Sequence, residues 1–176
     1  MQEPEVSLLI ALHYIRNGLT DDNVKVSIDG AHIRTGETVH FNIAEFLTEH
    51  YCRKVNGDAD RWQGVYDVEG YEQKVIIDSR PGEGDVVIRL PDGNRLYVES
   101  KKVRKGKSNH EYPAMREAIG QLMTGCEFTK NVIPAVAVPY TYKSAELAER
   151  WSKLPQIEAT GIRFILVHEN GAIHMI

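Results

Sequence analysis

At 176 residues the chain has the length of one ordinary domain, long enough to bury about 70% of its unfolded surface in a single core. Its hydrophobic content of 42% and charged content of 26% are ordinary globular values, which argue against a disordered chain, a collagen-like fibre and a disulfide scaffold. The formal net charge of −4 gives no global sign of a nucleic-acid or membrane partner.

Neither a membrane span nor a secretion signal is visible in the sequence. No run approaches the roughly 20 consecutive apolar residues of a span, and the N-terminus lacks the basic start of a signal peptide. Cys52 and Cys126 have no cysteine or histidine at metal-ligand spacing, so we interpret them as reduced packing thiols. We expect a cytoplasmic protein, prokaryotic or phage-like in character, without a membrane partner.

The first 41 residues predict a helix followed by a small hairpin. Apolar residues recur at helical spacing over Glu5–Asn17. Val24–Ile28 and Ala31–Ile33 then flank Asp29-Gly30, a pair typical of hairpin turns. We expect residues 1–41 to form an N-terminal extension of the core.

Residues 42–138 predict the core itself. Asn42 is a suitable N-cap for a helix whose buried stripe ends at Tyr51, and the Gly- and Asp-rich segment Asn56–Gly70 is expected to be an ordered surface loop. Three strand-like runs follow as an antiparallel meander: Tyr71–Ser79, Asp85–Leu90 and Leu96–Val103. The core ends with a helix over Pro113–Gly125 and a buried strand over Ala135–Val138.

The rest of the chain, residues 139–176, predicts a helix capped by Ser144 and two terminal strands, Ile162–Val167 and Ala172–Ile176. The order of elements indicates an α/β fold in one domain, residues 1–176. We expect three layers, in which helices flank a mixed central sheet made of the antiparallel meander and a parallel strand.

Alternation constrains how the last two meander strands pair. Their apolar faces are Val86, Ile88 and Leu90 in the first strand and Leu96 and Val98 in the second. These faces coincide only if opposed residue numbers sum to an even value, as when Leu90 lies opposite Leu96. In that register Asp85 lies opposite Lys101, and both share one side with Glu99. A two-residue turn would give an odd sum, so we predict a longer turn or a bulge at Pro91–Arg95.

Two carboxylates and an ammonium on one side indicate phosphodiester hydrolysis. Asp85 and Glu99 supply hard oxygen ligands for Mg²⁺ or Mn²⁺, and the Ser100 carbonyl is a further candidate ligand. Lys101 can hold the attacking water and offset phosphate charge. The alternative for these residues is a solvated strand face with a cross-strand Asp–Lys pair.

The spacing of these residues resembles a known motif. Gly84-Asp85, thirteen intervening residues and then Glu99-Ser100-Lys101 are similar to the bipartite motif of the PD-(D/E)xK, or restriction-endonuclease-like, nuclease superfamily. The element order over residues 42–138 resembles that superfamily's helix, three-strand meander, helix and strand. Small restriction endonucleases and archaeal Holliday-junction resolvases share this plan. The resemblance implies that Asp85 and Glu99 are metal ligands and that Lys101 is the catalytic lysine.

The same resemblance implies further site residues. The superfamily often adds a carboxylate from the helix before the meander, for which Glu45 is our first choice and Glu49, one turn later, the substitute. Some members carry a glutamine on the helix after the motif, and Gln121 occupies such a place.

A basic run follows the motif directly. Beyond Lys101 it comprises Lys102, Arg104, Lys105 and Lys107, which we expect to bind phosphates that flank the scissile one. Arg89 lies on the predicted face of the site and could extend this track. The local charge therefore indicates DNA as a partner even though the net charge does not.

The sequence predicts a Mg²⁺- or Mn²⁺-dependent DNA endonuclease. One alternative is a catalytically inactive nuclease-fold module that binds DNA or protein, and another is hydrolysis of RNA. A homodimer is the expected assembly for cutting two strands, with Glu5–Asn17 and the hairpin after it as candidate interface.

Overall fold

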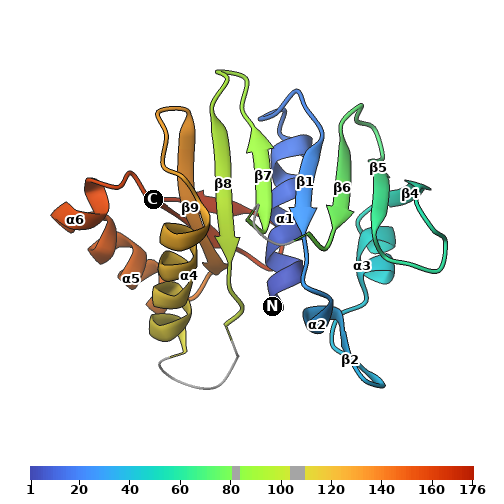
Figure 1. Cartoon of the computed structure of the whole chain (residues 1–176), viewed down its shortest axis with the longest axis horizontal. Helices are drawn as coiled ribbons and strands as arrows, with labels where there is room; N and C mark the ends of the chain where they lie inside the picture. The colour runs from blue at the N-terminus through green and yellow to red at the C-terminus, as the bar shows by residue number, and fades with distance from the viewer. Residues whose placement is uncertain (81–83, 104–109) are drawn as a thin grey trace.

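The computed structural model describes residues 1–80, 84–103 and 110–176. Within these residues the chain forms a nine-stranded mixed sheet in the order β11-β10-β9-β8-β7-β1-β6-β5-β4, with helices on both faces (Figure 1). The expected three-layer α/β arrangement is therefore confirmed. The helices are α1 (Glu3–Arg16), α2 (Gly30–Ile33), α3 (Ile43–Glu49), α4 (Glu111–Gly125), α5 (Tyr142–Ser152) and α6 (Pro155–Glu158). The strands of the sheet are β1 (Val24–Ser27), β4 (Cys52–Asn56), β5 (Gly64–Val68), β6 (Lys74–Asp78), β7 (Val86–Arg89), β8 (Arg95–Ser100), β9 (Val132–Pro139), β10 (Arg163–Val167) and β11 (Ile173–Met175), and a separate hairpin contains β2 (Arg34–Thr35) and β3 (Thr38–Val39).

Each face of the sheet carries its own apolar core. One cluster joins α1 and α3 to alternate residues of the strands, among them Val86 and Val98, which are fully buried. The other joins α4 and α5 to the opposite face through residues such as Val136 and Phe164. Helix α1 has buried residues all round its circumference, as expected of a helix enclosed by a core. Its predicted role as a dimer interface is therefore wrong, because its apolar side chains are covered within the chain.

The β7–β8 hairpin confirms the parity predicted from its sequence. Val86 lies opposite Val98 and Ile88 opposite Leu96, so the opposed numbers sum to an even value and the apolar residues share one face. The predicted pairing of Leu90 with Leu96 is wrong by two residues, because the amide of Leu90 donates to the carbonyl of Asn94 instead. The turn spans residues 91–93, longer than two residues as predicted, and Gly93 supplies the positive φ of 86° that it requires.

Strand β1 lies in the middle of the sheet and not in an N-terminal extension. It runs parallel to β6 and antiparallel to β7, with Val24 and Val26 fully buried. The predicted hairpin over residues 24–33 is wrong because Asp29 caps α2, its carboxylate accepting from the amide of Ala31. The predicted meander is also wrong in its first strand: the three antiparallel neighbours are β1, β7 and β8, and β6 lies beyond β1.

The segment between β1 and β7 is more ordered than its composition indicates. Residues 56–70, predicted as a loop, contain β5, which pairs with β4 and β6 and buries Tyr66 and Val68. Asn42 caps α3 as predicted, since its side chain accepts from the amide of Glu45. Tyr51 is 71% exposed with a φ of 53°, so its predicted burial is wrong.

The C-terminal part confirms its predicted element types. Strands β8, β9 and β10 are parallel neighbours joined by α4 and α5, and β11 pairs antiparallel with β10. The cap of α5 is Thr141, and Ser144 completes the capping box from inside the helix. In the described part of the chain, no helix combines the length and the apolar character that crossing a membrane needs.

Candidate active site

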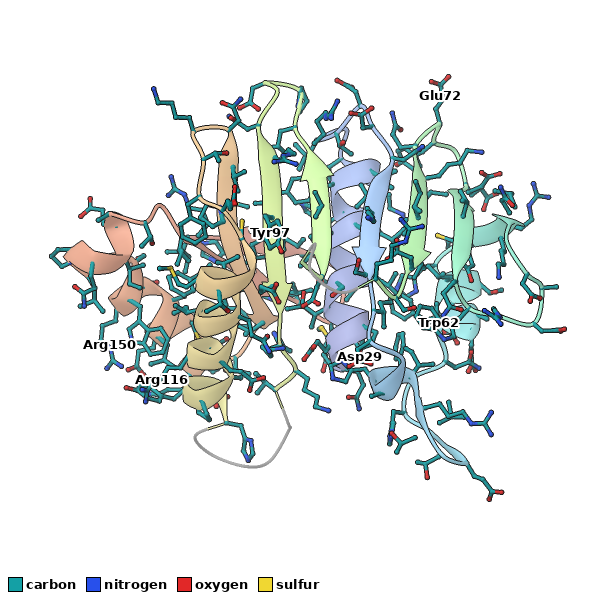
Figure 2. The ribbon with its side chains drawn as sticks, viewed as in Figure 1. Asp29, Trp62, Glu72, Tyr97, Arg116 and Arg150 are labelled. Atoms are coloured by element: carbon teal, nitrogen blue, oxygen red, sulfur yellow. The ribbon has the colours of Figure 1, made fainter. Side chains whose placement is uncertain are left out.

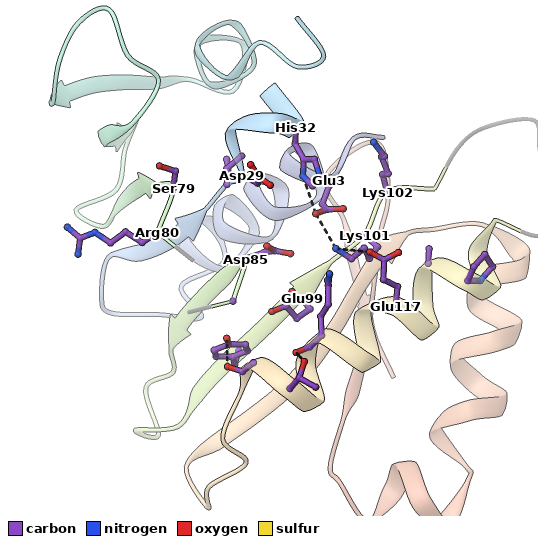
Figure 3. A pocket seen from close by; sticks show the side chains of 18 of the residues that line it. Glu3, Asp29, His32, Ser79, Arg80, Asp85, Glu99, Lys101, Lys102 and Glu117 are labelled. Carbon is purple, nitrogen blue, oxygen red and sulfur yellow. Dashed lines mark hydrogen bonds and ion pairs between the residues drawn. The ribbon is translucent and has the colours of Figure 1, made fainter. Parts of the chain in front are cut away.

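A cavity of about 1000 Å³ lies between α4 on one side and α2 with the start of α1 on the other (Figure 3). Asp85, Glu99 and Lys101 all line it, so the structure brings together the three residues predicted from the sequence. Lys102 and Gln121, two further predicted residues, line it as well.

Asp85 is held by main-chain hydrogen bonds on both sides. Its carbonyl accepts from the amide of Ser27 in β1, and its amide donates to the carbonyl of Val98 in β8, both at 2.9 Å. Its carboxylate oxygen Oδ2 accepts from the amide of Ser100 at 2.7 Å. These bonds fix the carboxylate where β1, β7 and β8 meet.

Gly84 allows Asp85 to take this position. Its φ is 75°, in the left-handed region that favours glycine, and a Cβ there would lie 2.6 Å from a ring carbon of Tyr97. Tyr97 lies beside α4 (Figure 2), and its hydroxyl donates to the carbonyl of Gly125 at 3.1 Å. Packing and backbone conformation therefore both favour a glycine directly before Asp85.

Burial and mutual repulsion raise the pKa values of both carboxyl groups. Burial is the largest of the effects that raise the pKa of Asp85 to about 7; the charges of Glu99 and Glu3 also raise it, whereas the Ser100 amide and Lys101 lower it. Burial also raises the pKa of Glu99; Lys101 lowers it and Glu3 raises it. Carboxylates that repel one another in a buried site are stabilised by a bound cation.

Lys101 lies at the centre of a chain of charged groups. Its side chain is only 11% exposed, and its ammonium lies 3.3 Å from Glu3 Oε1 and 3.8 Å from Glu117 Oε1 (Figure 3). The predicted position of Lys101 opposite Asp85 is wrong, because Asp85 is hydrogen-bonded to Val98 and Ser100 of β8 instead. Lys101 thus pairs with carboxylates from helices on both faces of the sheet.

Glu3 is, with His32 and Glu117, a site residue that was not predicted from the sequence. It lies in the first turn of α1, is 8% exposed, and shares its Oε1 between Lys101 and His32 Nδ1, the latter at 3.2 Å. A glutamate in a first helical turn is ordinary, so its sequence position carries little signal. Recognising β1 as the first meander strand would have pointed to α1, the helix before it.

The carboxylates predicted for that role lie elsewhere. Glu45 is exposed at the start of α3, where it accepts a hydrogen bond from the side chain of Asn42. Glu49 is exposed near the end of the same helix. Neither lines the cavity, because α3 packs against β4, on the far side of β6 and β5 from the motif strands.

The remaining predicted residues divide into three groups. Arg89 does not line the cavity; it ends β7 and lies 3.5 Å from Asp22. Ser100 is fully buried and its hydroxyl contacts that of Ser7 at 3.0 Å, while ligation by its carbonyl stays a prediction. The predicted phosphate contacts Arg104, Lys105 and Lys107 lie outside the described residues.

The carboxylates of Asp85 and Glu99 fit a single divalent cation that is bound by few protein ligands. Among the described residues, no three His, Cys, Asp or Glu side chains are grouped closely enough to hold a metal together. Asp85 and Glu99 provide carboxylate oxygens, which Mg²⁺ and Mn²⁺ prefer, and Mg²⁺ keeps several waters when few carboxylates bind it.

Comparisons with known proteins leave the function to be argued from these residues. No protein-family model, no curated protein and no solved structure matches the chain.

Proposed function

We propose that the protein is a metal-dependent DNA endonuclease of the PD-(D/E)xK type. The observation that carries the proposal is the meeting of Asp85, Glu99 and a nearly buried Lys101 in one cavity. Structural ion pairs also bury charge, but they do not require two repelling carboxylates beside a lysine at the edge of an open cavity.

The topology supports this proposal independently of the motif. Helix α1, the antiparallel neighbours β1, β7 and β8, helix α4 and the parallel strand β9 follow the order that the resemblance implies. The motif residues stand on or directly beside the second and third of these strands, as in that superfamily. The segment between β1 and β7 is then an insertion into the core.

The protein residues divide the work of hydrolysis. Asp85 and Glu99 would hold Mg²⁺ or Mn²⁺, and Glu3, which is paired with Lys101, would hold that lysine in place. When bound, the ion would polarise the scissile phosphate and lower the pKa of a bound water. Lys101 orients the attacking water and offsets the charge that develops on the phosphate. Lys102, which also lines the cavity, would contact the DNA backbone beside the scissile phosphate.

Cleavage assays with matched variants test the proposal. Wild type, Glu99→Gln, Lys101→Ala and the control Lys153→Ala, an exposed lysine after α5, are incubated with plasmid, single-stranded DNA and four-way junctions in Mg²⁺ or Mn²⁺. We expect wild type and control to cut, and both site variants to lose about a hundredfold or more of the rate. EDTA should abolish cutting, and duplex RNA in the same assay tests the RNA alternative.

One observation favours the second candidate, a catalytically inactive binding module. Lys101 is engaged by Glu3 and Glu117, an arrangement that a purely structural ion-pair network would also show. The enzyme proposal is wrong if wild type binds these nucleic acids but cuts none of them, or if Lys101→Ala cuts as fast as wild type. In either case the catalytically inactive binding module becomes the better interpretation.

A further inference from the structure

The insertion between β1 and β7 forms one wall of the cavity. It leaves the core at Ile28 and returns at Gly84, and both residues line the cavity. Asp29, His32, Ser79 and Arg80, all within the insertion, also line the cavity on this side. The wall opposite belongs to α4, so a substrate held in the cavity contacts the insertion on one side.

A small hairpin projects from this wall into solvent. Residues 34–40 form it, with β2 and β3 outside the main sheet, and it extends beyond α2 at the edge of the molecule (Figure 1). All seven residues are exposed, including Val39 at 60%. The hairpin follows His32, which lines the cavity, with only Ile33 between them.

Local bonds keep this hairpin in shape without a core of its own. Arg34 lies opposite Val39 and Thr35 opposite Thr38, and Gly36 gives the turn a φ of 58°. The amide of His40 donates to the carbonyl of Ile33 at 2.8 Å, which ties the base of the hairpin to the buried end of α2. An isolated two-stranded hairpin is marginal in water, so the shape of this hairpin depends on these local bonds and on its tie to α2.

We propose that this projecting hairpin enters the major groove of duplex DNA and reads base edges beside the scissile phosphate. The inference rests on the proposed function and adds the element that selects the substrate. The dimensions agree, since a ribbon of two strands about 4.8 Å apart fits a groove about 12 Å wide and about 8.5 Å deep. The deep, narrow major groove of A-form RNA does not admit it.

The exposed side chains suit base reading better than charge attraction. Arg34 has donors for guanine O6 and N7, Val39 offers an apolar contact for a thymine methyl, and Glu37 can accept from the cytosine amino group. Arg34 and Glu37 cancel in charge, so the hairpin supplies little of the sequence-independent phosphate attraction. Its loss should therefore relax sequence preference more than it weakens general DNA binding.

A double variant separates the hairpin from the chemistry. Arg34→Ala with Val39→Ala removes one charge and one exposed apolar side chain from one face of the hairpin, together with the hydrogen bond that Arg34 Nε donates to the carbonyl of Gly36. The matched control, Arg53→Ala with Val55→Ala, removes the same types from exposed positions on β4, away from the cavity. Each protein digests a duplex pool of varied sequence, and the cut ends are sequenced. Hydrolysis of bis-para-nitrophenyl phosphate reports the metal site alone.

We expect wild type and control to prefer the same sequences, and the hairpin variant to lose about tenfold of that preference while its hydrolysis of the small phosphodiester stays within about twofold. Methylation of guanine N7, which faces the major groove, should slow cutting at the preferred sites by wild type but not by the hairpin variant. An unchanged cutting pattern in the hairpin variant, or a wild type without sequence preference, overturns the inference. A wild type that hydrolyses neither substrate overturns the proposed function instead.

Discussion

Gly84 precedes Asp85 and lies against the ring of Tyr97, so the position of the Asp85 carboxylate depends on the lack of a side chain at residue 84. We predict that Gly84→Ala destabilises the protein by about 2 to 4 kcal/mol, because it adds a left-handed alanine and a clash with the ring. Gly70→Ala is the matched control, with a φ of 84° and open space around it, and should cost only about 1 kcal/mol. Urea unfolding measures both; equal losses would show that the ring contact does not matter.

The raised pKa of Asp85 predicts how stability depends on pH. An unperturbed Asp titrates near 3.8, whereas Asp85 in the fold titrates at about 7, so between these values the folded protein keeps a proton that the unfolded chain has lost. Without metal, stability contributed by this group should fall as the pH rises through this window, by up to about 1.4 kcal/mol per unit, and level off above it.

Asp85→Asn should remove this part of the pH dependence, and Mg²⁺ should restore stability to wild type above pH 7. Urea unfolding at several pH values, in EDTA and in Mg²⁺, measures both effects. An asparagine variant with the same slope as wild type would assign the dependence to other groups.

Among the secondary-structure elements, the helix that precedes the antiparallel strands β1, β7 and β8 determines which additional carboxylate lies at the site. Because β1 is the first meander strand, that helix is α1, and its Glu3 reaches Lys101. Helix α3, favoured by the sequence analysis, lies within the insertion and packs on β4.

We predict that Glu3→Gln lowers the cleavage rate at least about tenfold, because it removes a charge from the site while preserving shape. Glu45→Gln, the same change in the first turn of the other helix, should leave the rate unchanged. Initial rates at saturating Mg²⁺ compare the two, with thermal unfolding as a check on folding. Loss of activity in the Glu45 variant alone would reverse the assignment.

At the scale of the whole molecule, the insertion and the core share one sheet. Strand β1 is hydrogen-bonded to β6 of the insertion and to β7 of the core, so the two parts cannot separate without breaking ladders. Trp62 lies at the β5 end of the molecule, and α5, which carries Trp151, lies at the other end (Figure 2).

We predict one cooperative unfolding transition. Variants with a single tryptophan, Trp62→Phe and Trp151→Phe, report the two ends separately by fluorescence during urea unfolding. Their midpoints should each coincide with the midpoint measured by circular dichroism on the same variant. Two separate transitions within one variant would mean that the insertion folds as its own unit.

Local features of this protein could be predicted from its amino-acid pattern alone. Alternation fixed which side of β7 and β8 carries Asp85 and Glu99, because a strand has a period of two and one face must be buried. Capping and apolar periodicity predicted the helix that Asn42 caps and the helix that contains Gln121, because these signals act within a few residues.

Which distant segments meet at the site could be seen only in the folded chain. Val24 and Val26 read equally well as part of a terminal hairpin or of a central strand, since both positions reward apolar alternation, and pairing with β6 and β7 chose the second. Because β1 pairs with β7, α1 packs against the strands beside Asp85 and Glu99. Glu3 therefore contacts Lys101, from which it is separated by 98 positions in the sequence. Contacts between such distant residues depend on the order of the strands in the sheet. That order is set by the packing of the whole sheet, so no short stretch of the sequence reveals it.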